Sequence, residues 1–168
     1  MPLEEWRHKS ERICIQLQAS ALFSACETIL AYFSFRQEPD LSSLFTTSGR
    51  RWGFPRCIGD SLVWHICLPQ NSQLPQRGAY GILEPHPSAP TLEPSDVDLI
   101  LVPAVACDVE GYRLGYGGGY YDRLLSSPEW ASKPTIGIVF EFAYLPQLPI
   151  EPWDRPLQAV CTEFDLRQ

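Results

Sequence analysis

The segment that most constrains the fold is the uninterrupted apolar run Leu-Ile-Leu-Val between Asp98 and Pro103. A strand with one face in water alternates apolar and polar residues, whereas a strand that is covered on both faces needs no polar positions. Continuous runs of this kind are typical of parallel sheets with helices on both sides. We therefore predict that residues 98–103 form the central strand of such a sheet.

The rest of the chain alternates between helical and strand-like patterns. Apolar residues recur at helical spacing over residues 4–30, with Ser20 as a break or cap between two helices. Further elements are expected as strands at 29–35, 52–55, 61–68, 135–140 and 158–161, short helices at 39–45 and 120–125, and an ordered, proline-rich loop at 70–94. This order predicts an α/β fold, a Rossmann-like three-layer sandwich with a mostly parallel central sheet. Because 168 residues suffice for one such unit, we expect residues 1–168 to form a single domain.

The charge balance restricts the partners. The chain has 13 Lys and Arg against 20 Asp and Glu, a net charge of -7, which disfavours nucleic acid and anionic membranes as partners. No apolar stretch approaches the length of a membrane helix and residues 1–10 are charged, so we expect a soluble cytoplasmic protein. Only Lys9 and Lys133 are lysines, so a bound phosphate would depend on arginine, backbone N–H groups and a metal. The oligomeric state is left open.

A glycine-rich segment, RLGYGGGYYDR at residues 113–123, is the strongest functional motif. Its four glycines permit positive φ angles and leave backbone N–H groups uncovered, so that several can converge on an anion where a helix begins. The pattern is not that of a dinucleotide-binding loop, because Tyr120 stands where the third glycine should be, and no G-K-[ST] follows for a P-loop. A glycine cluster alone can also mark nothing more than a tight turn.

The residues around these glycines favour a ligand over a simple turn. Arg113 offers a bidentate fork for phosphate, and Tyr120 and Tyr121 offer flat faces and hydroxyls. Asp122 falls in the first helical turn, where it could meet a magnesium ion that bridges phosphates. Together these residues predict an anion-binding site.

Two further acids stand out less. Asp154 lies between two prolines, where it could be a solvated loop acid or form a surface pair with Arg155. Glu38 could be a charge near a helix start. Neither position indicates a function by itself.

The motifs resemble the 5-formyltetrahydrofolate cyclo-ligase family. The match is carried by DLILVP at 98–103, Cys107-Asp108, GYRLG at 111–115 and GGGYYDR at 117–123, which are similar to the family's LILVP…G-x-RLG-x-G-x-GYYDR signature. Weaker similarities, at residues 10–17, 32–38, 80–85, 136–138, 153–154 and 160–162, extend it over nearly the whole chain. The resemblance implies the same α/β architecture, which certain sugar-phosphate isomerases and CoA transferases share.

The resemblance also implies a reaction, in which 5-formyltetrahydrofolate and ATP give 5,10-methenyltetrahydrofolate, ADP and phosphate with the help of Mg²⁺. It assigns catalysis to Arg113 and Tyr120, and Mg²⁺ binding to Asp122 and Asp154, which we expect to face the ligand cleft as unpaired acids. The ATP contacts it implies are Arg113, Leu114, Gly115, Tyr116, Gly117, Gly118, Gly119, Tyr120 and Tyr121. The folate contacts it implies are Phe33, Glu38, Tyr116, Gly117, Gly118, Gly119 and Tyr120.

The chain departs from the family at two places. Many members have lysine at the position of Gly118, although glycine there resembles a common bacterial variant. The family's N-terminal Lys-x-x-x-Arg would fall before Met1, so we expect this chain to lack that helix, since Arg7, Lys9 and Arg12 are in another register. The native start then lies upstream, or the ATP site is built differently, or the enzyme is weakened.

Two other functions are therefore kept open. The first is a non-catalytic folate-binding relative, motivated by the absent Lys-x-x-x-Arg. The second is an isomerase of a phosphorylated sugar on the same fold, which the glycine loop and the two acids do not exclude.

Overall fold

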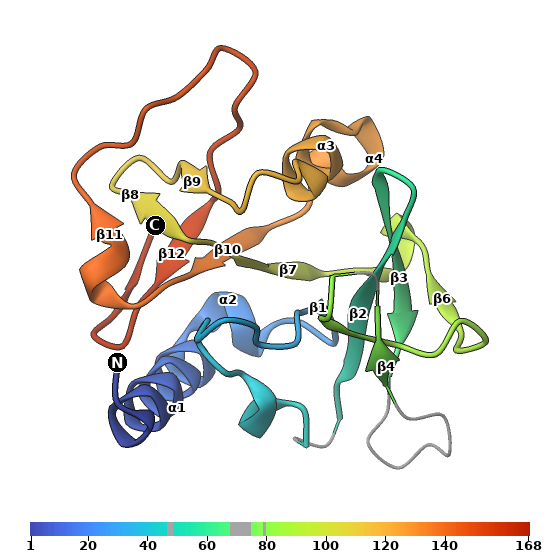
Figure 1. The fold of residues 1–168 in the computed structure, drawn as a ribbon, viewed down its shortest axis with the longest axis horizontal. Coiled ribbons are helices and arrows are strands. Elements are labelled where there is room, and N and C mark those ends of the chain that lie inside the picture. The colour runs from blue at the N-terminus through green and yellow to red at the C-terminus, as the bar shows by residue number, and fades with distance from the viewer. Residues whose placement is uncertain (47–48, 68–74, 79) are drawn as a thin grey trace.

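The middle layer of the protein is an eight-stranded sheet (Figure 1). The computed structural model describes residues 1–46, 49–67, 75–78 and 80–168. The strand order is β13 (Leu166–Arg167), β12 (Ala159–Cys161), β10 (Thr135–Ile138), β7 (Leu99–Pro103), β1 (Thr28–Leu30), β2 (Arg51–Ile58), β3 (Ser61–Ile66) and β6 (Thr91–Leu92). The strands from β12 to β2 run parallel, while β13, β3 and β6 are antiparallel to their neighbours. The predicted, mostly parallel sheet is confirmed, with β7 near its middle.

Helices cover both faces of this sheet (Figure 1). On one face lie α1 (Leu3–Ala19), α2 (Ala21–Ser24) and the 3-10 turn η1 (Ser42–Leu44), and on the other α3 (Tyr120–Ser126) and α4 (Pro128–Ala131). Successive residues of β7 alternate between the two layers: Leu99 and Leu101 join the α1 cluster, and Ile100 and Val102 the α3 cluster. All four are fully buried, which explains why the run contains no polar residue.

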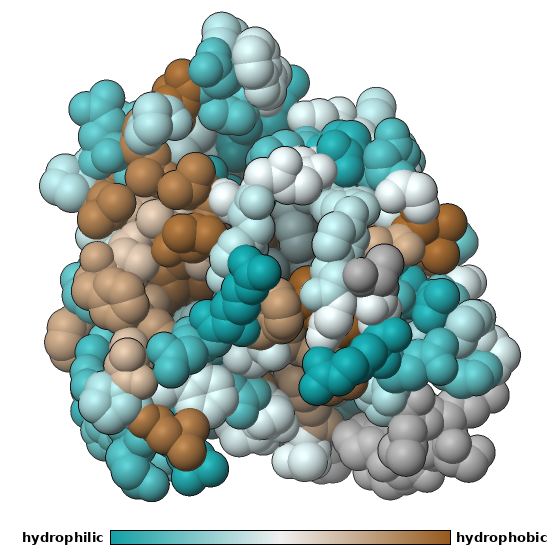
Figure 2. Space-filling model, in the orientation of Figure 1, coloured by the Kyte–Doolittle hydropathy of each residue, from teal (hydrophilic) through white to brown (hydrophobic). Residues whose placement is uncertain are grey.

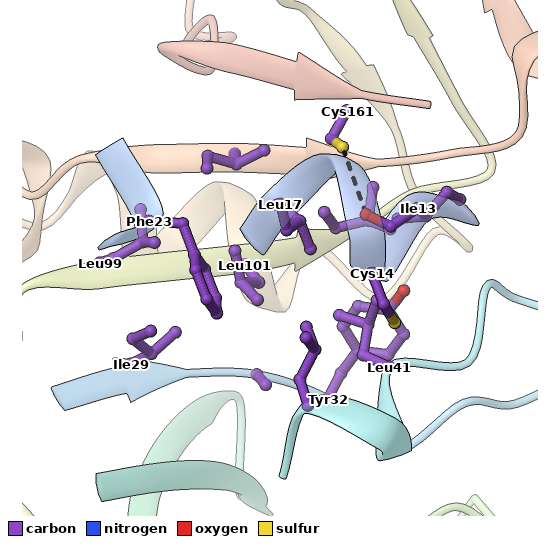
Figure 3. Packing of buried hydrophobic residues seen from close by; sticks show 14 of the residues in the cluster. Ile13, Cys14, Leu17, Phe23, Ile29, Tyr32, Leu41, Leu99, Leu101 and Cys161 are labelled. Carbon is purple, nitrogen blue, oxygen red and sulfur yellow. Dashed lines mark hydrogen bonds between the residues drawn. The ribbon is translucent and has the colours of Figure 1, made fainter. Parts of the chain in front are cut away.

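The α1 layer is held by close apolar packing (Figure 3). Ile13 and Leu17 of α1 and Phe23 of α2 lie against Leu99 and Leu101 of β7. A fully buried side chain of this size contributes about 1.5–3 kcal/mol relative to leaving it exposed. The Cys161 thiol also contacts the Ile13 carbonyl oxygen at 3.9 Å, which joins β12 to the same helix.

Two smaller sheets lie outside the main one. β8 (Ala106–Asp108) pairs with β9 (Arg113–Leu114) and β11 (Tyr144–Leu145), and β4 (Gln76–Arg77) pairs with β5 (Leu83–Glu84). Two further 3-10 turns are η2 (Pro94–Asp96) and η3 (Glu141–Ala143). The three-stranded sheet follows directly from β7 and carries the chain into the glycine loop.

Several predicted boundaries differ from the structure. The break expected at Ser20 is confirmed, since its hydroxyl accepts the Phe23 N–H at 3.2 Å, but the second of the two helices expected over 4–30 ends at Ser24 and β1 begins at Thr28. The strand expected over 29–35 pairs only at its start, and the helix expected at 39–45 is the shorter η1. Of the strand expected at 61–68 and the loop at 70–94, residues 68, 70–74 and 79 lie outside the described residues. In the described parts of the chain no helix is both long and apolar enough to cross a membrane.

Candidate functional site

The sheet has one point at which its strand order changes direction. From β1, the chain continues to β2 on one side, whereas β7 pairs with β1 on the other side and leads on to β10. In open parallel sheets, the segments that leave the strand ends at such a point diverge and leave a crevice in which ligands bind. The segments concerned are residues 31–40 after β1 and residues 104–119 after β7.

Arg113 connects the elements at this point. Its Nε donates to the carbonyl oxygen of Pro103, the last residue of β7, at 3.2 Å, and its Nη1 lies 3.5 Å from the Asp122 Oδ1 in α3. The guanidinium also lies over the Tyr121 ring, 5.2 Å from its centre. Only 7% of the arginine side chain is exposed. A cation is thereby fixed where β7 ends and α3 begins.

The glycine loop presents backbone between β9 and α3. Gly117 and Gly119 adopt positive φ angles of 98° and 72°, which other residues rarely adopt. A side chain at Gly115 would bring its Cβ to 2.7 Å from the Arg113 Nη2, so glycine is needed there for the arginine to lie over the loop. Gly117 has open space around it, with no atom within 4 Å of such a Cβ. The backbone of the loop at Gly117 is therefore accessible to a ligand.

The turn between β2 and β3 holds this loop in place. Arg123 donates from Nε to the Asp60 carbonyl oxygen at 2.6 Å and from Nη2 to the Gly118 carbonyl oxygen at 2.9 Å. The Tyr120 hydroxyl donates to the Gly59 carbonyl oxygen at 3.1 Å and lies 3.0 Å from the Tyr80 hydroxyl. The hydrogen bond with Tyr80 is the main cause that raises the pKa of Tyr120 to about 12.

Opposite the glycine loop, the segment after β1 is fixed to α1. The Trp6 Nε1 donates to the Glu38 carbonyl oxygen at 3.0 Å, and the Asp40 N–H donates to the Ser10 hydroxyl at 3.0 Å. The Ser34 hydroxyl donates to the same Glu38 carbonyl oxygen at 2.7 Å. These bonds hold the backbone at Glu38 and Asp40.

The Glu38 carboxyl group is buried and polar. Its residue is 9% exposed, and its Oε2 accepts the Phe35 N–H at 2.9 Å. Burial raises the pKa of Glu38 to about 7, against the lowering effects of the Phe35 N–H, the Arg113 charge and a hydrogen bond from Tyr116. Near neutral pH the Glu38 carboxyl is therefore present in two forms. The protonated form can donate a hydrogen bond, whereas the ionised form only accepts hydrogen bonds.

Two cavities flank residues 33–38. One of about 270 Å³ is lined by Glu38, Tyr116 and the apolar residues Val105, Phe140 and Phe142. The other, of about 470 Å³, is lined by Phe33, Trp6 and Leu83 among others, and Arg36 and Gln37 line both. Figure 2 shows a broad apolar area on the side of β11 and η3, bordered towards the middle of the face by hydrophilic side chains. Phe142 and Val105, 68% and 41% exposed, are apolar side chains that reach the surface beside the smaller cavity.

A family model described as the 5-formyltetrahydrofolate cyclo-ligase family matches residues 1–163. The chain belongs to this family. A 5-formyltetrahydrofolate cyclo-ligase of Mycolicibacterium smegmatis is 32% identical over 150 residues, which cover 85% of this chain and 77% of that protein. The NMR structure of the Aquifex aeolicus 5,10-methenyltetrahydrofolate synthetase is 32% identical, covers 100% of this chain and 84% of that chain, and superposes with a TM-score of 0.85.

A third relative matches over a shorter length. The cyclo-ligase of Escherichia coli K12 is 41% identical over 68 residues, which are 40% of this chain and 37% of that protein. The match thus spans well under two thirds of that relative's own length. The fold expected from the sequence is confirmed by the Aquifex aeolicus structure.

Most of the residues expected at the cyclo-ligase site lie near one another. Glu38, Tyr116, Arg113, Tyr121 and Asp122 form one connected group through the contacts described above. Asp122 differs from the expectation of an unpaired acid, because it pairs with Arg113 and is about half exposed. Two other expected contacts lie at the edges of this group: Leu114 is 47% exposed, and Phe33 stacks on Phe54 at 4.2 Å and lines the larger cavity.

Asp154 forms a hydrogen bond within its own loop. Its Oδ2 accepts the Glu151 N–H at 2.8 Å, within its own loop between β11 and β12. That loop is attached near β9, because the Leu157 N–H donates to the Gly111 carbonyl oxygen at 2.7 Å. The described residues contain no group of three or more His, Cys, Asp or Glu that could hold a metal. One or two carboxylates suit a magnesium ion that arrives with nucleotide phosphates rather than a preformed metal centre.

The sequence motifs missed three groups at the site. Arg123 stands inside the glycine motif, and nothing in the motif indicates that it ties the loop to the β2–β3 turn. Tyr80 and Arg36 are the other two. Only the weak similarities at residues 80–85 and 32–38 could have drawn attention to Tyr80 and Arg36.

Proposed function

We propose that the protein catalyses the ATP-dependent cyclisation of 5-formyltetrahydrofolate to 5,10-methenyltetrahydrofolate, with release of ADP and phosphate, and that it does so in the cytoplasm. Membership of the cyclo-ligase family supports this reaction. The observation that carries it in this chain is Arg113, a nearly buried cation held between the end of β7, the glycine loop and Asp122.

The proposed reaction has two steps, a phosphoryl transfer and a ring closure. The formyl oxygen attacks the γ-phosphorus of ATP, the bond to the bridging oxygen breaks, and ADP leaves. The resulting imidate phosphate has an electrophilic carbon, which N10 attacks to close the ring. The phosphate then leaves with the former formyl oxygen, and N10 loses its proton.

The residues fit the needs of this transfer. Phosphoryl transfer depends mainly on positioning and on neutralising the charge of the γ-phosphoryl group. Arg113 and the backbone of residues 115–119 would bind the phosphates, and Tyr116 and Tyr120 would lie between nucleotide and folate. Glu38, a carboxyl that can donate or accept near pH 7, would bind the polar heterocycle of the folate in the smaller cavity.

We further propose that Asp122 and Asp154 hold a magnesium ion together with the phosphates. When bound, the ion would supply positive charge that neutralises the phosphate oxygens. Asp122 is half exposed beside Arg113, so the Arg113 guanidinium and the Asp122 carboxylate would lie on the same side of the nucleotide.

The direct test is growth of the methenyl absorbance after 5-formyltetrahydrofolate, ATP and Mg²⁺ are mixed with the protein. We expect growth only when all are present, and a loss of about 100-fold in kcat/KM for Arg113→Gln, since a charged group aimed at the transferred phosphoryl is removed. Arg56→Gln is the matched control, because Arg56 pairs with Glu84 outside the site.

Absence of product with fresh ATP and Mg²⁺ would refute the proposed reaction. Folate binding by calorimetry in that case would identify a non-catalytic folate-binding relative. Conversion of a sugar phosphate without folate binding would indicate an isomerase instead.

A further inference from the structure

Arg36 occupies an unusual backbone position beside the proposed folate site. It and Gln37 have positive φ angles of 53° and 60°, which residues other than glycine rarely adopt. The bonds of Trp6 and Ser34 to the Glu38 carbonyl oxygen hold the chain directly after this turn. Strained conformations of this kind persist only where the surrounding structure determines them.

The Arg36 side chain lines both cavities around residues 33–38. Among the described residues that line these cavities, it is the one Lys, Arg or His. It is exposed, whereas Glu38, two residues later, is buried. The smaller cavity thus has a cation at its outer boundary and a protonatable acid inside.

The Arg36 guanidinium lies beside two aromatic rings. It lies 5.1 Å from the centre of the Phe35 ring and 6.0 Å from that of the Tyr116 ring. Within the described chain, no carboxylate lies within ion-pair distance of it, unlike Arg113, Arg56 and Arg167. Stacking involves the face of a guanidinium, so its in-plane N–H groups stay available for a bidentate carboxylate.

The proposed substrate has matching ends. A folate carries a hydrogen-bonding heterocycle at one end and a glutamate with two carboxylates at the other. A carboxylate placed beside the buried Glu38 would be disfavoured by like charge and by desolvation, whereas one beside Arg36 would be neutralised. We propose that Arg36 binds a carboxylate of the glutamate tail and is a determinant of specificity for glutamylated folates, an inference that rests on the proposed function.

The test compares two substrates that differ only in the tail: 5-formyltetrahydrofolate and 5-formyltetrahydropteroate, which lacks the glutamate. Arg36→Gln should raise the Kd and KM for the first about tenfold, as expected for loss of one charge-assisted contact. The Kd and KM for the second, the KM for ATP and kcat should stay unchanged. Arg36→Lys, which keeps the charge but not the fork, should fall between wild type and Arg36→Gln.

Arg7→Gln is the matched control, because it removes the same charge from an exposed site on α1 outside both cavities. Thermal midpoints of all variants show whether folding is intact. Equal weakening of both substrates would overturn the proposal and indicate that Arg36 supports the shape of the pocket. An unchanged Kd for both, or a rise in the KM for ATP alone, would also overturn it.

Binding and turnover separate this inference from the proposed function. Wild-type protein that binds 5-formyltetrahydrofolate more tightly than the tail-less compound, without turnover, would refute the reaction and retain the role of Arg36. Turnover of both compounds with equal KM would retain the reaction and refute the role of Arg36.

Discussion

At Glu38, burial and hydrogen bonding act in opposite directions on one carboxyl group. Burial disfavours the charged form and raises the pKa to about 7, while the Phe35 N–H, Arg113 and Tyr116 favour the charge. Because the folded-state pKa lies above the usual value of 4.5, this group stabilises the fold fully only below about pH 4.5. Its contribution is lost as the pH rises through about 7.

The free energy of unfolding should reflect this difference. Between about pH 4 and about pH 8, the free energy of unfolding of the wild-type protein should fall by about 3 kcal/mol relative to that of Glu38→Gln. The glutamine keeps the shape of the side chain and cannot ionise. Urea unfolding of both proteins across this pH range measures the difference. A pH-independent difference would show that Glu38 ionises in the folded protein as it does in the unfolded chain.

Asp122 offers a second prediction for a single residue. Asp122→Asn should lower kcat about 100-fold, because a carboxylate proposed to hold Mg²⁺ at the phosphates becomes neutral. The Asp122 side chain is half exposed, and the nearly buried Arg113 keeps its bond to the Pro103 carbonyl oxygen and its contact with the Tyr121 ring, so stability should change by less than about 1 kcal/mol. Kinetics as a function of Mg²⁺ concentration, with Glu129→Gln on α4 as control, test this. Normal activity of Asp122→Asn would argue against the metal assignment.

Among the elements, the β2–β3 hairpin and the glycine loop act as one unit. The turn at Gly59 and Asp60 receives hydrogen bonds from Tyr120 and Arg123, and Arg123 also holds the loop at Gly118. The loop contains glycines with positive φ, which gain conformational freedom when released. The hairpin therefore restricts a segment that would otherwise adopt many conformations.

Removal of this connection should weaken nucleotide binding more than it weakens the fold. Arg123→Ala should raise the KM for ATP about tenfold and cost about 1–2 kcal/mol in stability, the usual range for two hydrogen bonds near the surface. Arg77→Ala is the control, since Arg77 donates one bond to the Gly81 carbonyl oxygen in another turn. An unchanged KM for ATP in Arg123→Ala would show that the loop keeps its conformation without the hairpin.

Across the whole molecule, an element could be predicted from the sequence where its residue pattern was long enough to recognise. β7 could be predicted because every position of the run is buried, on alternating faces. β8, β9 and β11 have only two or three residues, too few to show a period, so the small sheet that carries Arg113 could not be found.

The candidate site also has a part that could be predicted from the sequence and a part that could not. The glycine motif is contiguous, so its residues could be recognised in the sequence. The contact of Arg123 with Asp60 and the position of Arg36 between two cavities join segments that are distant in the chain or depend on backbone conformation. Only the folded structure brings such groups together.

The central claim is that the formyl oxygen attacks ATP at this site, and the fate of that oxygen tests it most directly. 5-Formyltetrahydrofolate labelled with ¹⁸O in the formyl group would be converted with unlabelled ATP and Mg²⁺, and the released phosphate analysed by mass spectrometry. We predict one ¹⁸O atom in each phosphate, formed in step with the methenyl product. Unlabelled phosphate, or no methenyl product at all, would contradict it.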